Sequence, residues 1–117
     1  MSFDNKDKSV NTKNPRYSKL TIGVCPDQWG VWFPDDPKQI DPDVAMSEMA
    51  EAGFEVLETG PYGYFPKDPK ELQRWVDERG MRVVAGTGWG ILHKEEAWAD
   101  TEKTFRAIGE THAALGA

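Results

Sequence analysis

The fold is decided by residues 54–80, which read FEVLETGPYGYFPKDPKELQRWVDERG. The stretch opens with a short apolar strand over 54–59, passes through a loop rich in aromatic residues and glycine, and ends in an amphipathic helix. Asp68 and Pro69 mark the helix start, because Asp caps free backbone N–H groups and Pro fits the first helical turn. Gly80 marks the helix end. The stretch therefore encodes one complete strand–loop–helix unit.

The same order of elements occurs on both sides of this stretch. Before it, we expect a strand over 20–25 and a helix that begins after Asp41 and ends before Gly53. After it, a strand over 81–85 leads through another loop into a helix over about 95–115. Consecutive units of this kind imply parallel strands joined by right-handed crossovers.

Composition narrows the class of protein. A length of 117 residues suits one domain, and a net charge of −6 argues against a nucleic-acid partner. No apolar run is long enough to cross a bilayer, so we expect no membrane partner. Cys25 is the single cysteine, which excludes an internal disulfide and predicts a cytoplasmic location. Residues 1–17 are polar and predict a flexible tail, with 18–117 as the folded part.

Three βα units are too few for a closed barrel. A TIM (β/α)8 barrel needs about 250 residues. We therefore expect an incomplete α/β structure, with three consecutive βα units of such a barrel, parallel strands and helices on the outer face. The open strand edges predict self-association. A complete three-layer α/β domain with helices on both sides of the sheet is the alternative.

Helical periodicity predicts which side chains are buried. In the first helix, the expected apolar stripe comprises Val44, Ala45, Met49 and Ala52. In the last helix, one seam is expected to hold Trp98, Thr101, Phe105, Ile108, His112 and Leu115. His112 on this seam is interpreted as a core histidine with local hydrogen bonds.

Two titratable residues in or before the loops are candidates for chemistry. Glu58 lies at the end of the second strand, where barrel enzymes place catalytic groups; the alternative is an edge-strand carboxylate in water. His93 lies in the third loop and could bind a sugar hydroxyl or phosphate, or move a proton near neutral pH. It could equally be a solvated loop residue.

Aromatic side chains are concentrated in the three expected loops. They comprise Trp29, Trp32, Phe33, Tyr62, Tyr64, Phe65 and Trp89. Flat aromatic faces pack against the C–H faces of sugars, so these loops predict a sugar site, with a hydrophobic lid or a subunit contact as alternatives. The run Gly86-x-Gly88-x-Gly90 does not match the dinucleotide fingerprint G-x-G-x-x-G, because the last glycine of that fingerprint would fall at position 91, where this chain has Ile91.

Three stretches together resemble a known family. Residues 22–30, 48–54 and 58–64 read IGVCPDQWG, EMAEAGF and ETGPYGY. They resemble the opening of the sugar phosphate isomerase/epimerase family, whose members have a xylose isomerase-like TIM barrel and which has inosose dehydratase as a close relative. The resemblance runs from about Lys19 to Ala117.

The resemblance implies a divalent metal, often Mn²⁺, held by acidic and histidine side chains on later strands. The metal would polarise the carbonyl of a sugar while a glutamate removes the neighbouring proton to give an enediol. None of those metal ligands matches a residue of this chain. We therefore expect the chain to bind no metal specifically and to be inactive alone.

The resemblance also implies which residues in or near the three loops face the substrate. Gln28, Trp29 and Trp89 would bind substrate, and Glu58 and His93 would contact its hydroxyls or orient the reacting sugar. The implied activity is that of a metal-dependent sugar or sugar phosphate isomerase or epimerase acting on a small sugar or cyclitol. An inosose dehydratase-like lyase and a non-catalytic sugar-binding or scaffold domain remain open.

Overall fold

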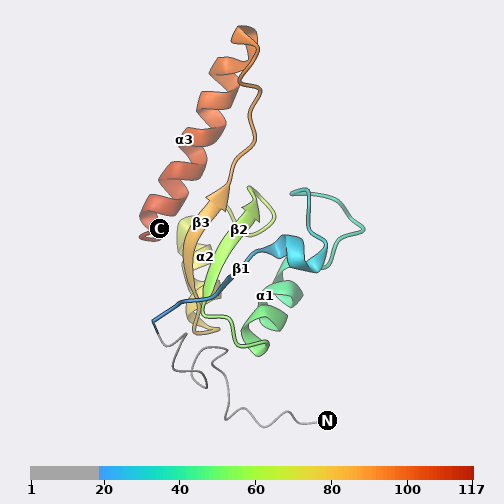
Figure 1. The fold of residues 1–117 in the computed structure, drawn as a ribbon, viewed down its shortest axis with the longest axis vertical. Helices are drawn as coiled ribbons and strands as arrows, with labels where there is room; N and C mark the ends of the chain where they lie inside the picture. The colour runs from blue at the N-terminus through green and yellow to red at the C-terminus, as the bar shows by residue number, and fades with distance from the viewer. Residues whose placement is uncertain (1–18) are drawn as a thin grey trace.

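The computed structural model describes residues 19–117, so the predicted tail over 1–17 lies outside the described residues (Figure 1). Three βα units follow one another along the chain. Their elements are β1 (Gly23–Val24), a 3-10 turn (Pro26–Trp29), α1 (Pro42–Glu51), β2 (Val56–Pro61), α2 (Pro69–Asp77), β3 (Arg82–Thr87), a 3-10 turn (Glu95–Ala97) and α3 (Trp98–Ala114).

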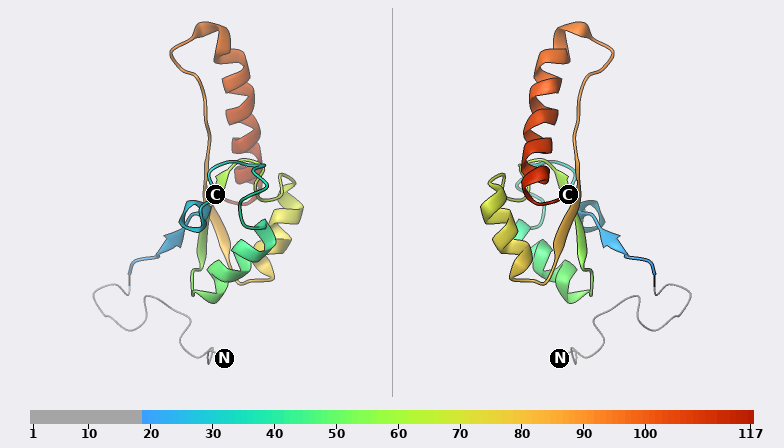
Figure 2. Two further views of the ribbon diagram at one scale, coloured as in Figure 1. Left: turned by 90° about the vertical axis from the view of Figure 1, so that its right-hand side faces the viewer. Right: turned by 90° about the vertical axis from the view of Figure 1, so that its left-hand side faces the viewer.

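The strands form one parallel sheet in the order β1-β2-β3. Edge-on views show the three helices on one side of this sheet (Figure 2). This one-sided arrangement confirms the prediction of parallel strands with helices on an outer face. It contradicts the three-layer alternative, which needs helices on both faces. The side of the sheet away from the helices is called the open face below.

The helix starts follow the predicted capping chemistry. The Asp41 carboxylate accepts hydrogen bonds from the backbone N–H groups of Asp43 and Val44, at 2.9 and 3.3 Å. Asp68 accepts one from Lys70 at 3.0 Å. These bonds satisfy donors that a helix N-terminus leaves free.

Strand bounds differ from the predicted ones. β1 has two residues instead of the expected 20–25, because Leu20 and Ile22 lie exposed before it and Pro26 opens a 3-10 turn. β2 ends two residues later than expected, at Pro61, and β3 also extends two residues further, to Thr87. Gly60, Pro61, Gly86 and Thr87, which the sequence assigned to loops, thus belong to the strands.

The core lies between the sheet and the first two helices. Its buried side chains are Val24, Val31, Ala45, Met46, Met49, Leu57, Tyr64, Phe65, Leu72, Val76, Met81 and Val83. The stripe expected on α1 was partly wrong, because Val44 and Ala52 are exposed and Met46 is fully buried. The stripe is rotated by about one residue, which places two long methionine side chains against the sheet.

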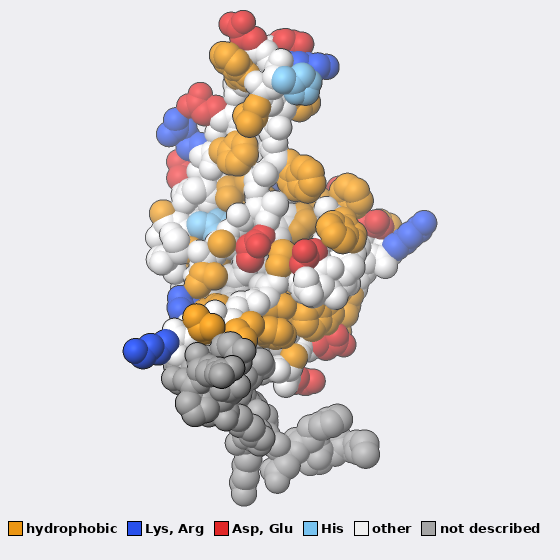
Figure 3. Space-filling model, viewed as in Figure 1, with side chains coloured by type: hydrophobic (Ala, Val, Ile, Leu, Met, Phe, Trp, Pro, Cys, Tyr) orange, Lys and Arg blue, Asp and Glu red, His pale blue; other side chains and the backbone are white. Residues whose placement is uncertain are grey.

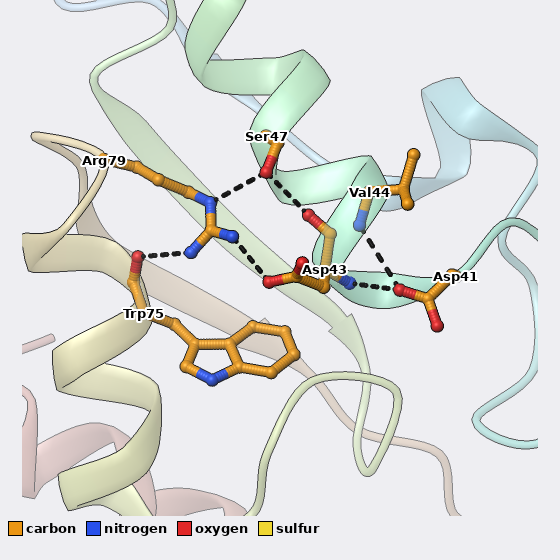
Figure 4. A network of polar contacts seen from close by, with 6 residues as sticks. All are labelled: Asp41, Asp43, Val44, Ser47, Trp75 and Arg79. Carbon is orange, nitrogen blue, oxygen red and sulfur yellow. Dashed lines mark hydrogen bonds and ion pairs between the residues drawn. The ribbon is translucent and has the colours of Figure 1, made fainter.

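Arg79, just beyond α2, joins that helix to α1 (Figure 4). Its guanidinium donates to the Asp43 carboxylate at 2.5 Å, to the Ser47 hydroxyl at 3.1 Å and to the Trp75 carbonyl at 3.0 Å. The planar fork of Arg suits several acceptors at once. These bonds fix the spacing of the two helices behind the sheet.

α3 packs on the sheet only near its C-terminal end. Ile108, Thr111 and His112 are buried there, and the rest of the helix projects beyond the strands beside the segment that follows β3 (Figure 1). Trp98 and Phe105 are 54% and 45% exposed, so the predicted buried seam was wrong for the N-terminal half of this helix. Periodicity marks an apolar face but does not say whether another element covers it.

His112 is a core residue, as predicted. Its Nδ1 lies 2.7 Å from the Ile108 carbonyl and its Nε2 lies 3.0 Å from the Thr59 hydroxyl. In the neutral ring, Nδ1–H donates to the carbonyl and Nε2 accepts from the hydroxyl. Both ring nitrogens are therefore satisfied within the fold.

Candidate functional site

A groove of about 330 Å³ lies where the three loops meet at the carboxyl ends of the strands. Its lining residues are Trp32, Phe33, Pro34, Pro61, Tyr62, Thr87, Trp89, Thr104 and Ile108. None of these side chains is charged. The arrangement is an apolar, aromatic-walled groove with two threonine hydroxyls, and such a surface suits a neutral ring that carries both C–H faces and hydroxyl groups.

The predicted aromatic residues divide into three groups. Trp32, Phe33, Tyr62 and Trp89 line the groove, and Trp89 is 72% exposed. The rings of Tyr64 and Phe65 are buried, packed edge to face with centroids 4.8 Å apart. Trp29 is half-buried against the core. Four of the loop aromatics thus remain available to a ligand.

Two residues expected to bind substrate lie in the 3-10 turn after β1. The Trp29 indole N–H donates to the Glu48 carboxylate at 2.7 Å, which turns this ring toward α1. Gln28 is exposed. Neither residue lines the groove, whereas Trp89 does.

Glu58 lies on the open face of β2. Its neighbours in sequence, Leu57 and Thr59, are buried on the helix side, so alternation places Glu58 on the other side. The Thr87 hydroxyl of β3 donates a hydrogen bond to the Glu58 carboxylate. Because Thr87 also lines the groove, it connects the groove to the carboxylate.

Cys25 follows β1 on the same open face. Burial raises the pKa of its thiol from 9.0 to about 12, and the negative charges of Glu58 and Asp27 contribute in the same direction. A protonated thiol is a weak nucleophile and a weak metal ligand. The chemistry of this part of the sheet therefore rests on the Glu58 carboxylate.

His93 lies far from Glu58. The Trp98 indole N–H donates to the Leu92 carbonyl at 3.0 Å, which places residue 93 beside the N-terminal end of α3. His112, near the other end of α3, contacts the end of β2. The 14 helical steps from Trp98 to His112 span roughly 20 Å at 1.5 Å per residue. The structure therefore does not bring the two expected catalytic residues together.

The glycines at the end of β3 and directly after it have a packing role. A Cβ atom at Gly86 would lie 2.2 Å from His112 Nε2, and one at Gly90 would lie 2.3 Å from Thr101 Cγ2. A Cβ at Gly88 would lie 2.5 Å from the Phe105 ring. Alternate glycines thus let α3 lie directly on the extended chain, which explains the pattern without a dinucleotide.

Thr87 and Thr104, the two groove residues with hydroxyl groups, were not singled out by the sequence. A threonine in a glycine-rich loop carries no signal of its own, and its orientation depends on the pairing of β2 with β3. The preceding Glu58 at a strand end was the available signal, because a half-buried carboxylate needs a hydrogen-bond donor.

Residues 19–117 contain neither a cluster of metal ligands nor a membrane-spanning helix. Within this range, no three or more histidine, cysteine, aspartate or glutamate side chains are grouped so that they could hold a metal ion. The residues present do not fit the metal that the family resemblance implies. None of the helices in the same range has the length and apolar character needed to span a membrane.

Comparison with known proteins gives one consistent name. An inosose dehydratase of Clostridium botulinum (strain Eklund 17B) is 34% identical over 99 residues, which cover 84% of this chain and 32% of that protein. The inosose dehydratase of Clostridium beijerinckii is 33% identical over 90 residues, or 76% and 29% of the two chains. That of Lacticaseibacillus casei is 28% identical over 97 residues. The chain is similar to inosose dehydratases.

This similarity covers a limited part of those enzymes. The chain spans about a third of the length of the curated relatives that it matches. No family model matches it, and no solved structure matches it significantly. The relatives and the one-sided parallel sheet together support the resemblance to xylose isomerase-like barrels.

Proposed function

We propose that this chain forms three βα units of a sugar- or cyclitol-processing barrel, and that the reaction of the whole barrel is dehydration of a cyclitol ketone. The observation that carries the proposal is the similarity to inosose dehydratases over 84% of the chain. The sequence alone favoured an isomerase or epimerase, but the relatives' name favours the lyase. Both reactions begin with removal of a proton beside a carbonyl.

The groove supplies binding rather than proton transfer. The rings of Trp32, Tyr62 and Trp89 offer flat faces to the C–H groups of a six-membered ring, and the threonine hydroxyls offer hydrogen bonds. Glu58 beside the groove can accept a hydrogen bond from a ligand hydroxyl. These contacts would hold the ring while it loses a proton beside the carbonyl and a hydroxyl from the next carbon, so that one water leaves overall.

The divalent metal of the family would polarise the carbonyl when bound. No ligand cluster for it lies within residues 19–117. We expect the purified 117-residue chain to show no isomerase, epimerase or dehydratase turnover, with or without Mn²⁺. A Mn²⁺-dependent rate from the purified chain would contradict this expectation.

Ligand binding by the chain tests the proposal. We expect a cyclitol ketone to change the fluorescence of the groove tryptophans in a saturable way, and Trp89→Ala to weaken this binding about tenfold. Trp75→Phe, at a core position on α2, is the control and should leave affinity unchanged. Glucose 6-phosphate should bind less well, since no charged side chain among the described residues lines the groove. Failure of the cyclitol ketone to bind would count against the proposal.

A non-catalytic sugar-binding module is the second candidate. It is favoured by one observation, that the groove is formed entirely by residues within 32–108. A folded monomer with one cooperative unfolding transition would support this reading, since saturable binding without turnover is expected of the chain under both proposals.

A further inference from the structure

Two irregularities in strand pairing bracket Glu58. Leu57 pairs with Val83 but Glu58 pairs with Ala85, so β3 carries one extra residue there. Between Glu58 and Pro61 the extra residue is on β2. Bulges of this kind re-aim side chains and are frequent beside active sites.

The bulge in β3 decides where Thr87 points. Val83 faces the helices, and regular alternation would turn residues 85 and 87 the same way. The extra residue shifts the alternation by one position, so that residue 86 faces the helices and residue 87 does not. The position of Gly86 shows this, since a Cβ there would meet His112 of α3. Thr87 therefore lies on the side opposite the helix, with Glu58.

The contact between the two side chains is direct. The Thr87 hydroxyl donates to one oxygen of the Glu58 carboxylate in a half-buried setting. Hydrogen bonds to an ionised acceptor are stronger and shorter than neutral ones, so this one limits the rotation of the carboxylate. Within residues 19–117, the second oxygen of Glu58 accepts no hydrogen bond, so it can accept one from a ligand hydroxyl.

We propose that Thr87 is a positioning residue, which holds the Glu58 carboxylate at the edge of the groove so that its second oxygen meets the ligand. This inference rests on the proposed function for the ligand, but the contact itself is a property of the chain. Thr87 shares the groove wall with Thr104 of α3, for which no contact with Glu58 is recorded. Thr104 therefore provides a matched control.

The experiment uses the full 117-residue chain and four variants. Thr87→Val keeps the shape and β-branching but removes the hydroxyl, Thr87→Ser keeps the hydroxyl, Thr104→Val is the control, and Glu58→Gln identifies the Glu58 carboxyl signal. The carboxyl ¹³C signals of labelled glutamate are recorded by NMR, and binding of a cyclitol ketone is followed by tryptophan fluorescence. Circular dichroism checks that each variant is folded.

We expect Thr87→Val to move the Glu58 carboxyl signal and to weaken binding by up to about tenfold, because a carboxylate released from Thr87 must be ordered when the ligand binds. Thr87→Ser should restore both, and Thr104→Val should leave the Glu58 signal in place. Wild-type affinity in Thr87→Val, or an unmoved Glu58 signal, would overturn the inference and leave the proposed function standing. Absence of binding by the unmodified chain would overturn both. If Thr87→Val does not fold, loss of binding in a folded Thr87→Ser would contradict the inference.

Discussion

The surroundings of Cys25 on the open face of the sheet change the pKa of its thiol. Burial, together with the nearby carboxylates of Glu58 and Asp27, raises the pKa of its thiol from 9.0 to about 12. The folded chain therefore holds this proton more tightly than the unfolded chain does. The sign follows directly: the stability that this group contributes is present below pH 9.0 and is lost as pH rises from there toward 12.

Alkylation by iodoacetamide tests this shift. At pH 8 we expect Cys25 to react at least about a hundredfold more slowly in the folded chain than in urea, because its thiolate fraction is lower by about three powers of ten. The rate should still climb with pH above 9, where an ordinary thiol levels off. Mass spectrometry of quenched samples gives both rates. Equal rates in the folded and unfolded chains would show that the pKa is not raised.

The sequence predicted the orientation of a side chain where that orientation depends on one strand alone. Glu58 lies on the open face of β2, because alternation along one strand is local, but it is the third of six residues in β2 and not at the strand end that the sequence predicted. Its partner Thr87 was not predictable, since the orientation of Thr87 depends on a bulge formed only when two strands pair. The separation of His93 from Glu58 was likewise invisible, because it depends on how far the chain extends after β3.

At the scale of elements, Arg79 is the main polar tie between α1 and α2. We expect Arg79→Lys to lower the free energy of unfolding by about 1–2 kcal/mol, because an ammonium cannot reproduce the three directed bonds of the guanidinium. Urea denaturation followed by circular dichroism measures the change. Asp43→Asn in the same background would complete a double-mutant cycle.

An arginine-to-lysine substitution at an exposed position of α3 is the control for Arg79→Lys. Arg106 on α3 is exposed and pairs with Glu102 at 2.6 Å, four residues earlier. Arg106→Lys should leave stability unchanged within error, because exposed pairs contribute little. Equal losses from both variants would mean that the Arg79 bonds do not join the helices.

The contact between α3 and the glycine run leads to a second stability prediction. Gly86→Ala places a methyl group against the His112 ring and should cost roughly 1–3 kcal/mol, the usual cost of overpacking. Gly109→Ala on α3 meets open space and should instead stabilise by about 0.5–1 kcal/mol, through helix propensity. Thermal and urea unfolding of the two variants measure these changes in the free energy of unfolding. A tolerated Gly86→Ala would show that α3 does not pack closely on β3.

Helix bounds were well predicted because caps and stop signals are local. The Asp41 and Asp68 caps and the glycines at 53 and 80 lie where the sequence indicates. Burial along α3 was not well predicted, because the apolar periodicity of the helix is the same whether or not a neighbouring element covers it. Strand bounds shifted for a related reason, since the pairing partner decides how many loop residues join the sheet.

At the scale of the whole molecule, apolar side chains remain uncovered on the open face and along the projecting part of α3. Figure 3 looks onto the open face and shows them around the strand ends and up the projecting segment. The exposed large residues there include Val84, Trp89, Ile91, Leu92, Trp98 and Phe105. Contiguous apolar surface of this kind, next to strand edges with free backbone groups, favours association.

We expect the chain to self-associate in a concentration-dependent way, as measured by sedimentation velocity. Val84→Lys should shift the distribution toward monomer, because a lysine on the edge strand β3 opposes both burial of the open face and strand pairing. Val44→Lys is the matched control: it changes a similarly exposed valine on α1, in the helix layer, and should leave the distribution as it was. A shift toward monomer in Val44→Lys but not in Val84→Lys would mean that the helix layer, and not β3, carries the contact. A monodisperse monomer at all concentrations, with one cooperative unfolding transition, would instead mean that three βα units suffice as a stable unit.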